Sequence, residues 1–345
     1  MSEPDFAQAG LGSRPVSHAP GAGGGGGAAP ATDLLSQLSS PIILKGGSRT
    51  AHRDPAVIYE QGVFYLYCSY VLTEEDDKIY WYTALSKSQD LRRWTPPRIL
   101  TPKDQDLNYS SPGNVVRFGD EWILCLQTYP IPGYRRGDPL RFGNQNARVF
   151  IMRSHDLENW SEPELLHVKG PDVSREAIGH MIDPYLIEDK DEPGKWWCFY
   201  KQKGVSYSWS RDLTRWTFAG HTDCGENVCV LVDDNEYTVF HSPANGIGVK
   251  RSADLTRWRD VGQPITLGQQ EWIWAENRLT AGFVLDARHT PGVGKFLMFF
   301  HGMGPGKVRT TENVNAYCSL GIAWSDDLTT WTWPGAPGAS GKRRE

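Results

Sequence analysis

A seven-residue phrase, Ser-x-Asp-Leu-x-x-Trp, occurs five times along the chain and constrains the fold more than any other feature of the sequence. The copies are SQDLRRW, SHDLENW, SRDLTRW, SADLTRW and SDDLTTW, and they close on Trp94, Trp160, Trp216, Trp258 and Trp331. The closing tryptophans lie 42 to 73 residues apart, so a constant unit is joined by loops of variable length. Recurrence of a fixed phrase is the sequence signature of repeat architectures.

Each copy of the phrase is preceded by three β-rich stretches and is often followed by a fourth, shorter one. In the first unit these stretches are DPAVIYE, VFYLYCSY, IYWYTALSKS and PRILT. Four strands per unit and five units predict an all-β, five-bladed β-propeller with four antiparallel strands per blade, within the usual range of about four to eight blades. We expect the phrase itself to be structural, because Ser and Asp can bond the backbone of a tight turn while Leu and Trp fill the space between blades.

The two ends of the chain differ in composition from the middle. Residues 1–38 are rich in Gly, Ala, Pro and Ser and include GAGGGGGAAPA, so they cannot bury enough apolar surface to offset the entropy lost on ordering. We therefore expect a disordered tail over 1–38, one propeller catalytic domain over 39–334, and a flexible C-terminal tail over 335–345. A single all-β domain can use most of a chain of this length.

Charge and composition exclude several classes of partner. The chain carries 36 Lys and Arg against 41 Asp and Glu, a formal charge of −5, without the dense basic blocks that bind nucleic acid. No apolar run is long enough to span a membrane, and no signal peptide is recognisable, which favours a cytoplasmic protein. The six cysteines lie mostly in apolar runs without a CxxC pair, so we expect buried free thiols. The sequence does not indicate an oligomeric state.

The propeller fold predicts where polar side chains gather. The first strand of each blade lines the central channel and the second returns antiparallel to it, so the start of the first and the end of the second share one face. We expect convergence there of the predicted strand starts, which are Asp54, Asn114, Asp183, Glu226 and the run Glu276, Asn277 and Arg278, and of the strand ends His241 and His301.

Three of these residues, Asp54, Asp183 and Glu226, are acidic. Carboxylates crowded into one pocket raise one another's pKa, so that one can stay protonated as an acid while another acts as a base. Glycoside hydrolysis requires such a pair. Asp54 and Asp183 are each followed by Pro, which fixes the backbone beside the acid. Asp-Pro is also a common turn dipeptide, but two at matching strand starts with a Glu at a third favour catalysis.

On the motifs His52-Arg53-Asp54-Pro55, Met181-Ile182-Asp183-Pro184 and Gly225-Glu226-Asn227, the chain resembles the five-bladed propeller glycosidases. The resemblance is to glycoside hydrolase family 43 above all, to its neighbour family 117, and more distantly to family 32. It covers about residues 39–334 and implies that Asp54 is the general base, that Asp183 tunes pKa values and orients the sugar, and that Glu226 is the general acid.

One departure from the family pattern concerns the acid. That residue usually lies in a Glu-Gly-Pro context, whereas Glu226 is followed by Asn227 and Val228. Glu276 is therefore an alternative acid, and Glu176 a more distant one. A His has been given the acid's role in family 117, which keeps His241 and His301 as further alternatives.

The channel mouth also needs surfaces for a sugar ring, whose C–H faces stack on aromatic side chains while its hydroxyl groups bond polar ones. The candidates for these contacts are Arg53, Asn114, Tyr129, Trp272, Trp274 and Arg278. The polar, Gly- and Pro-rich residues 128–149 are expected to form a rim loop that helps to select the substrate. No cofactor or metal-ligand motif is present, and a channel-bound divalent ion such as calcium, known in several relatives, is left open.

The leading hypothesis is an exo-acting, inverting glycosidase that cleaves a terminal arabinofuranoside, xyloside or galactofuranoside. A retaining enzyme like the family 32 fructosidases is an alternative, although their Asn-Asp-Pro-Asn-Gly phrase differs from Arg53-Asp54-Pro55-Ala56 here. A mannoside phosphorylase would need a basic phosphate pocket that the sequence does not reveal. The alternative of another class is a non-catalytic propeller that binds carbohydrate or docks a protein.

Overall fold

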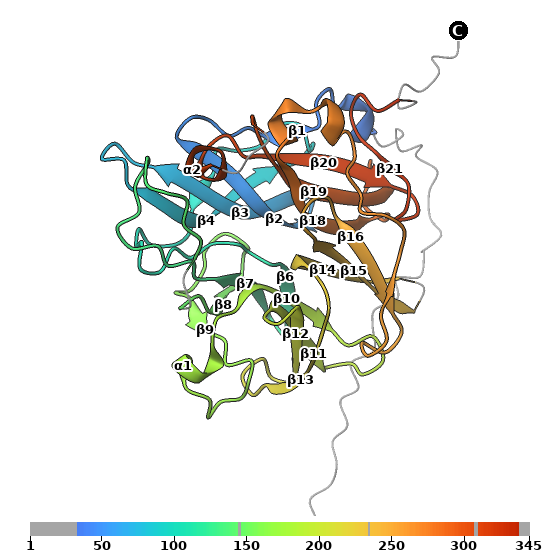
Figure 1. Ribbon diagram of the computed structural model, residues 1–345. Helices are drawn as coiled ribbons and strands as arrows, with labels where there is room; N and C mark the ends of the chain where they lie inside the picture. Colours follow the sequence, from blue (N-terminus) through green and yellow to red (C-terminus); the bar gives the residue numbers. More distant parts are fainter. Residues whose placement is uncertain (1–32, 144–145, 234, 307–309, 338–345) are drawn as a thin grey trace, which may run out of the picture. The chain divides into compact units, whose positions relative to one another are not determined.

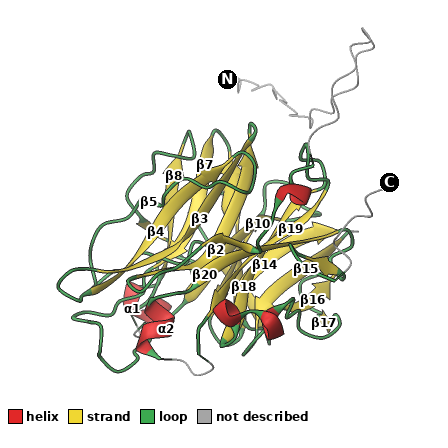
Figure 2. Ribbon diagram, turned by 90° about the horizontal axis from the view of Figure 1, so that it is seen from above, coloured by secondary structure: helices red, strands yellow, loops and turns green. Residues whose placement is uncertain are grey.

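The protein is described by a computed structural model over residues 33–143, 146–233, 235–306 and 310–337. These residues form five separate antiparallel sheets whose first strands pack against one another around a central axis (Figure 1). The few helices are short and lie at the ends of strands (Figure 2). The predicted all-β, five-bladed propeller is therefore confirmed.

Four blades are built from strands that are consecutive in the sequence. Blade I contains β2 (Thr50–Glu60), β3 (Val63–Thr73), β4 (Ile79–Ser88) and β5 (Arg98–Ile99). Blade II contains β6 (Val115–Phe118), β7 (Glu121–Gln127), β8 (Val149–Ser154) and β9 (Glu164–Leu165). Blade III contains β10 (Ile182–Glu188), β11 (Trp196–Lys201), β12 (Val205–Ser210) and β13 (Thr217–Thr222). Blade IV contains β14 (Glu226–Asp233), β15 (Glu236–Ser242), β16 (Gly248–Ser252) and β17 (Arg259–Asp260).

Blade V joins the two ends of the described chain. It contains β18 (Arg278–Ala287), β19 (Lys295–Met303), β20 (Ser319–Ser325) and β21 (Trp331–Thr332), and β20 also pairs with β1 (Ile42–Leu44). In that pairing Ile42 lies opposite Gly321, and the backbone N–H of Ile322 donates to the carbonyl of Pro41 at 2.9 Å. The N-terminal segment thus closes the ring on the last blade, which the sequence analysis did not predict.

The segment before β1 differs from its expected place in a disordered tail. Residues 35–37 form a short 3₁₀ turn, η1 (Leu35–Gln37), in which the Leu35 side chain is 5% exposed and belongs to the main core. The backbone N–H of Leu34 donates to the carbonyl of Gly292 at 2.8 Å. Apolar residues at 34, 35 and 38 are enough to attach this end of the tail to blade V. Residues 1–32 and 338–345 of the expected tails lie outside the described residues.

All five copies of the repeated phrase form the same turn. In the second copy, Oδ1 of Asp156 accepts the backbone N–H groups of Glu158 and Asn159, and Nε1 of Trp160 donates to the carbonyl of Leu157. These backbone bonds hold the pKa of Asp156 below its ordinary value. The leucine of every copy is buried with φ between +56° and +64°.

The turn also connects neighbouring blades. The hydroxyl group of Tyr67 in blade I donates to the carbonyl of Leu157 in blade II at 2.6 Å, and the rings of Tyr67 and Trp160 meet edge to face, with centroids 5.6 Å apart. Phe240 and Trp331 make the same kind of contact between blades IV and V. The expected role of Leu and Trp between blades is confirmed in these contacts.

Two further expectations concern the core. All six cysteines are buried free thiols, as predicted from their apolar surroundings. No helix among the described residues has the length and apolar character needed to cross a membrane.

Candidate active site

Every blade enters its first strand through the same backbone irregularity. Five residues at this position have left-handed backbone conformations, with φ between +45° and +54°: Asp54, Ser111, Asp183, Asn227 and Ala281. Strand pairing is shifted beside four of them, which is the behaviour of a β-bulge. Successive side chains of a regular strand point to opposite faces, but the bulge allows both Arg53 and Asp54 to line one cavity.

The backbone N–H of each bulge residue is accepted by a side chain of the preceding blade. The five bonds run from Asp54 to His301 Nδ1 (3.1 Å), from Ser111 to Ser69 Oγ (2.7 Å), from Asp183 to Gln127 Oε1 (2.5 Å), from Asn227 to Asp183 Oδ2 (3.2 Å) and from Ala281 to Ser242 Oγ (2.8 Å). Together they form a ring of hydrogen bonds around the channel.

Four of the five acceptors occupy equivalent positions. Each lies on the second strand of its blade, opposite the residue that comes just before the bulge residue. The four acceptors are Ser69, Gln127, Ser242 and His301. In blade III the residue at this place is Lys201, whose ammonium group has no acceptor. The carboxyl group of Asp183 accepts the N–H of Asn227 in its place. This difference brings Asp183 into contact with blade IV.

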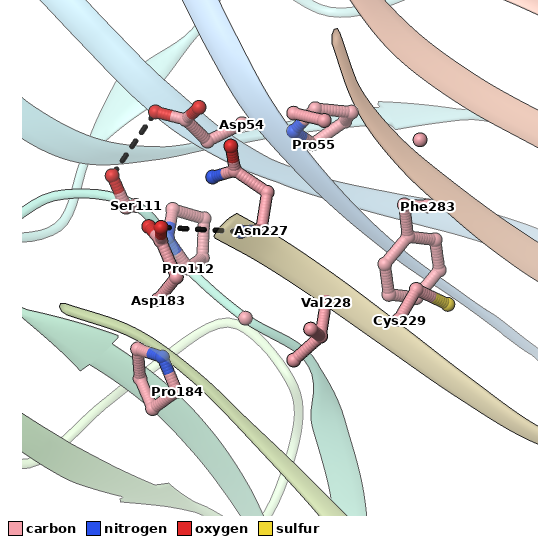
Figure 3. A pocket seen from close by; sticks show the side chains of 13 residues that line it. Asp54, Pro55, Ser111, Pro112, Asp183, Pro184, Asn227, Val228, Cys229 and Phe283 are labelled. Carbon is pink, nitrogen blue, oxygen red and sulfur yellow. Dashed lines mark hydrogen bonds between the residues drawn. The ribbon is translucent and has the colours of Figure 1, made fainter. Parts of the chain in front are cut away.

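Asp54 is held by hydroxyl groups from two blades. Its Oδ2 accepts from Ser69 Oγ at 2.8 Å and from Ser111 Oγ at 3.0 Å, and Figure 3 shows Asp54 and Ser111 facing each other across the channel. Its Oδ1 lies 3.5 Å from His301 Nδ1, and no group in the described part of the chain donates a hydrogen bond to it. Because His301 Nδ1 accepts the Asp54 N–H, we assign the imidazole proton to Nε2. Oδ1 is therefore the oxygen of Asp54 that can take up a proton.

Asp183 is only 7% exposed and lies between the other two acids. Burial raises its pKa well above the ordinary value, and the charges of Glu226 and Asp54 raise it further. Its Oδ2 accepts the N–H of Asn227 from blade IV (Figure 3). These surroundings favour the protonated form of Asp183 more than those of an exposed carboxyl group would.

Glu226 is the most exposed of the three acids, with a third of its side-chain surface open. Its Oε1 accepts from Nη2 of Arg278 at 2.9 Å, and the same nitrogen donates to the carbonyl of Pro243. Asn227 follows with φ +52°, at the place where the resembled family has Gly. Asn is one of the few other residues that adopt this conformation readily, so the departure from Glu-Gly-Pro keeps the backbone that directs Glu226.

The three acids line one cavity of about 340 Å³, a size suited to a small ligand. Three of the expected substrate contacts line it too, namely Arg53, Tyr129 and Arg278, together with residues that were not predicted: Trp81, Ser111, Gln127, Arg141, Phe142, His180 and Met303. Beneath it a channel cavity of about 20 Å³ has lining residues from all five blades and room for about one water molecule.

One wall of the cavity is aromatic. The rings of Trp81 and Tyr129 are stacked with centroids 5.0 Å apart, and the guanidinium carbon of Arg53 lies 4.8 Å from the Trp81 ring centroid. Gly143 of the rim loop packs so closely on Tyr129 that a Cβ atom there would lie 2.4 Å from the ring. Tyr129, Arg141, Phe142 and Gly143 all line the cavity, which places the described part of residues 128–149 at the rim, as expected.

Trp272 and Trp274 do not reach this cavity, which corrects their expected position. In a strand, alternating side chains would point one of the two rings into the cavity, but residues 269–275 form two 3₁₀ turns, η2 (Gln269–Glu271) and η3 (Ile273–Ala275). The two indole rings stack on each other with centroids 5.2 Å apart, and both stack on Phe300. They belong to the aromatic packing of blade V.

Asn114 and Glu276 are also placed elsewhere. Ser111 is the blade II residue equivalent to Asp54, whereas Asn114 Nδ2 donates to the carbonyl of Leu186 and its Oδ1 accepts the N–H of Leu186, which ties blade II to blade III. Glu276 caps η3, and its Oε1 accepts the N–H of Gly306. The bulge of blade V falls on Ala281 instead, so Glu276 is not brought near Asp54 and Asp183.

The alternative histidine acids occupy supporting positions. His301 is fully buried and accepts the Asp54 N–H, as described above. His241 Nδ1 accepts the N–H of Gly225 at 3.0 Å, one residue before Glu226, and burial lowers the pKa of His241 to about 4. His241 does not line the cavity. Glu176, the distant alternative, lies on the short helix α1 (Arg175–Ile178), and its side chain is exposed.

The serines around Asp54 escaped the sequence analysis for different reasons. Ser111-Pro112 repeats the spacing of Asp54-Pro55 and Asp183-Pro184, so a third residue-Pro pair was available as a signal. Ser69 carries no such signal, because only the strand register places it opposite Arg53. Gln127 likewise depends on an isolated bridge to Ser110.

The described side chains around the channel are not arranged as ligands for a divalent ion such as calcium. Among the residues that the structure describes, no three His, Cys, Asp or Glu side chains gather so that they could hold a metal ion. His301 Nδ1 already accepts the Asp54 N–H, and Oδ2 of Asp54 already accepts two hydroxyl groups. We therefore assign no step to a metal ion.

No protein-family model and no curated protein matches the sequence. Solved structures do match in fold. The catalytic domain of the GH62 alpha-L-arabinofuranosidase of Coprinopsis cinerea is 14% identical, covers 83% of this chain and 98% of its own, and has a TM-score of 0.57. A thermostable family-43 glycoside hydrolase is 13% identical, covers 86% of this chain and 95% of its own, and has a TM-score of 0.57.

A third structure is CoXyl43, a GH43 beta-xylosidase/alpha-arabinofuranosidase from a compost microbial metagenome, solved with xylotriose. It is 12% identical, covers 86% of this chain and 98% of its own, and has a TM-score of 0.54. At these identities the likeness is one of fold. The chain therefore shares the five-bladed β-propeller of the GH43 and GH62 glycoside hydrolases.

Proposed function

We propose that the protein is a glycoside hydrolase that removes a terminal sugar with inversion, using Asp54 as general base and Glu226 as general acid. The observation that carries the proposal is the gathering of three carboxyl groups from three blades on one cavity, where Asp54 is held by two hydroxyl groups and burial raises the pKa of Asp183. Acid–base catalysis needs one acid that holds its proton beside another that has lost it. Different surroundings of neighbouring carboxyl groups produce that difference.

In the proposed reaction Asp54 takes a proton from water through Oδ1, and the oxygen of that water forms the new bond to the anomeric carbon. Glu226 gives its proton to the glycosidic oxygen as the old bond breaks. Both products then carry a hydroxyl group, and the proton left on Asp54 returns through solvent. The bonds to Ser69 and Ser111 hold Asp54 in one orientation throughout.

Asp183 has the proposed role of a proton partner for Glu226. The two acids are electrostatically coupled, so the pair, and not either residue alone, determines where its proton lies. Oε1 of Glu226 accepts a hydrogen bond from Arg278. In the proposed reaction a sugar oxygen takes up this hydrogen bond, and Glu226 then serves as the acid.

The first substrates to test are arabinofuranosides, xylosides and galactofuranosides, and exo action on a terminal residue fits a cavity of this size. Solved proteins of the same fold include alpha-L-arabinofuranosidases, a beta-xylosidase and a beta 1,3 galactosidase. Some of them were solved with cellotriose or xylotriose, which supports a carbohydrate as the partner here.

The test is a panel of aryl glycosides hydrolysed by wild type, Asp54→Asn and Glu226→Gln, with Glu176→Gln as the matched control on an exposed helix. Loss of a general acid or base costs about 10²- to 10⁴-fold in rate, so both site variants should lose at least 10²-fold in kcat, while the control keeps wild-type activity. Full activity in both site variants would overturn the assigned roles. Proton NMR of the first-formed anomer separates inversion from the retention expected of a fructosidase-like enzyme.

A further inference from the structure

Arg53 is a cation in the proposed catalytic cavity, and no described residue forms an ion pair with it. Within the described ranges its guanidinium makes one hydrogen bond, a long one of 3.5 Å from Nη1 to the carbonyl of Val314. No carboxylate in the described parts of the chain lies within ion-pair distance of it, Asp54 and Glu226 included. Burial lowers the pKa of Arg53, but the longer-range attraction of acidic groups, Asp54 and Glu226 among them, raises it. The net shift of the Arg53 pKa is upward.

The other two arginines of the cavity differ from Arg53 in this respect. Arg278 is bonded to the Glu226 carboxylate and to the carbonyl of Pro243. Arg141 lies at the rim, with its guanidinium 3.5 Å from the carboxylate of Asp138 and over the ring of Tyr134. Among the three arginines that line the described cavity, Arg53 is the one without a direct carboxylate partner.

Such an arrangement is costly unless a ligand completes it. Arginine stays charged at any physiological pH, and the partly buried Arg53 has an Nε that is buried without a hydrogen-bond partner in the described part of the chain. Asp183 is not a direct partner either, because its carboxyl group accepts the N–H of Asn227 in blade IV. Stacking on Trp81 fixes the plane of the guanidinium and leaves its nitrogen-bearing edge as the group for recognition.

We propose that Arg53 binds a carboxylate group on the sugar that enters the cavity, so that the preferred substrate is a uronic acid glycoside rather than a neutral one. This inference rests on the proposed function and narrows its substrate class. A planar guanidinium matches a carboxylate with two parallel hydrogen bonds. Phosphate fits less well, because its second negative charge would face Asp54 and Glu226 with one unpaired guanidinium to offset it.

The experiment measures binding separately from turnover. Isothermal titration of wild type with D-glucuronate and D-galacturonate, each beside D-glucose or D-galactose, is repeated with Arg53→Met, Arg53→Lys and Arg117→Met, and melting curves check the fold of each. Arg117 is the matched control, because its guanidinium also lies over a Trp ring but is exposed and does not line the cavity. We expect wild type and Arg117→Met to bind at least one uronate at least 10-fold more tightly than its neutral partner. Arg53→Met should lose that preference, and Arg53→Lys should retain part of it.

Equal binding of neutral and acidic sugars by wild type would overturn the inference, as would a uronate preference that survives in folded Arg53→Met. Competition of inorganic phosphate with the uronate at millimolar concentration would also contradict it, since Arg53 would then be an unselective anion site. Hydrolysis of neutral aryl glycosides without any response to uronates would leave the proposed function intact while the inference fails. Uronate binding without hydrolysis of any glucuronide or galacturonide would support the binding role of Arg53 and contradict the proposed function.

Discussion

At the scale of single residues, the site depends on how each carboxyl group is surrounded. Asp54 and Asp183 have the same backbone conformation and the same 7% exposure, yet their partners differ. Asp54 receives two hydroxyl hydrogen bonds on one oxygen, whereas Asp183 receives one backbone N–H and the charges of two neighbouring acids. The chemical difference between equivalent residues therefore comes from the blades on either side.

Removing the hydroxyl groups around Asp54 tests its proposed positioning. Ser69→Ala and Ser111→Ala should each lower kcat by about 10-fold, in line with the net 1 to 1.5 kcal/mol of one hydrogen bond, with little change in KM. The double variant should lose less than the product of the two single effects, because Ser69 Oγ also accepts the N–H of Ser111 and the two act together. Steady-state kinetics with circular dichroism as a fold control measures this, and unchanged kcat in both single variants would contradict it.

The raised pKa of Asp183 predicts a pH-dependent stability. Its pKa is raised in the folded chain, so between the unfolded value of about 3.9 and the folded value the native state holds more protons than the unfolded state. Stability must then fall as pH rises through this window. Asp183→Asn, which keeps an oxygen for the Asn227 N–H, should melt at a higher temperature than wild type at pH 7, with the gap closing toward pH 4. A gap that does not depend on pH would show that Asp183 is ionised in the fold.

At the scale of elements, the strand-entry bulge is the unit that builds the site. Its left-handed residue recurs in all five blades, with an N–H that is accepted by the blade before it, and the strand pairing is shifted beside it in four of them. Asn227 is the blade IV member of this set, and its conformation directs Glu226 toward Arg278. Because of the bulge, two neighbouring residues of one strand, such as Arg53 and Asp54, both line the cavity.

Substitutions at Asn227 measure the cost of that conformation. Asn227→Gly should leave the free energy of unfolding within about 0.5 kcal/mol, because Gly adopts φ near +52° without strain. Asn227→Ala should lose about 1 to 2 kcal/mol, since a Cβ without a local hydrogen bond is unfavourable there. Urea unfolding of the two variants makes the comparison, and equal stability of the Ala and Gly variants would argue against a strained bulge.

At the scale of the whole molecule, the five repeated phrases and the strand patterns around them were sufficient to predict the propeller, its blade count and the meeting of Asp54, Asp183 and Glu226. The pairing of β1 with β20 could not be predicted, because a strand of three residues is too short to show an alternating pattern of apolar side chains. Trp272 and Trp274 misled for a related reason: alternation holds only in strands, and the chain forms 3₁₀ turns there. Asn114 was misplaced by three residues because the bulge position depends on register, not on composition.

Ring closure predicts the effect of shortening the chain. Deletion of residues 1–44 removes η1 and β1, exposes the edge of β20 and empties the place of Leu35 in the core. The loss of one buried leucine alone costs about 2 to 5 kcal/mol, so the melting temperature should fall by at least about 5 °C. Deletion of residues 1–32 alone is the matched control and should leave it unchanged, as their composition predicts. Equal melting of the two shortened chains would contradict closure by β1.

Asp54 and Glu226 are proposed to act as base and acid in glycoside hydrolysis, and the dependence of the rate on the leaving group distinguishes these two roles. The measurement is kcat/KM for wild type, Asp54→Asn and Glu226→Gln on aryl glycosides whose phenols span a wide range of acidity. The defect of Glu226→Gln should shrink toward the most acidic phenols, which leave without protonation, while the defect of Asp54→Asn should be the same for all of them. The same dependence in both variants, or no turnover of any glycoside by wild type, would contradict the account.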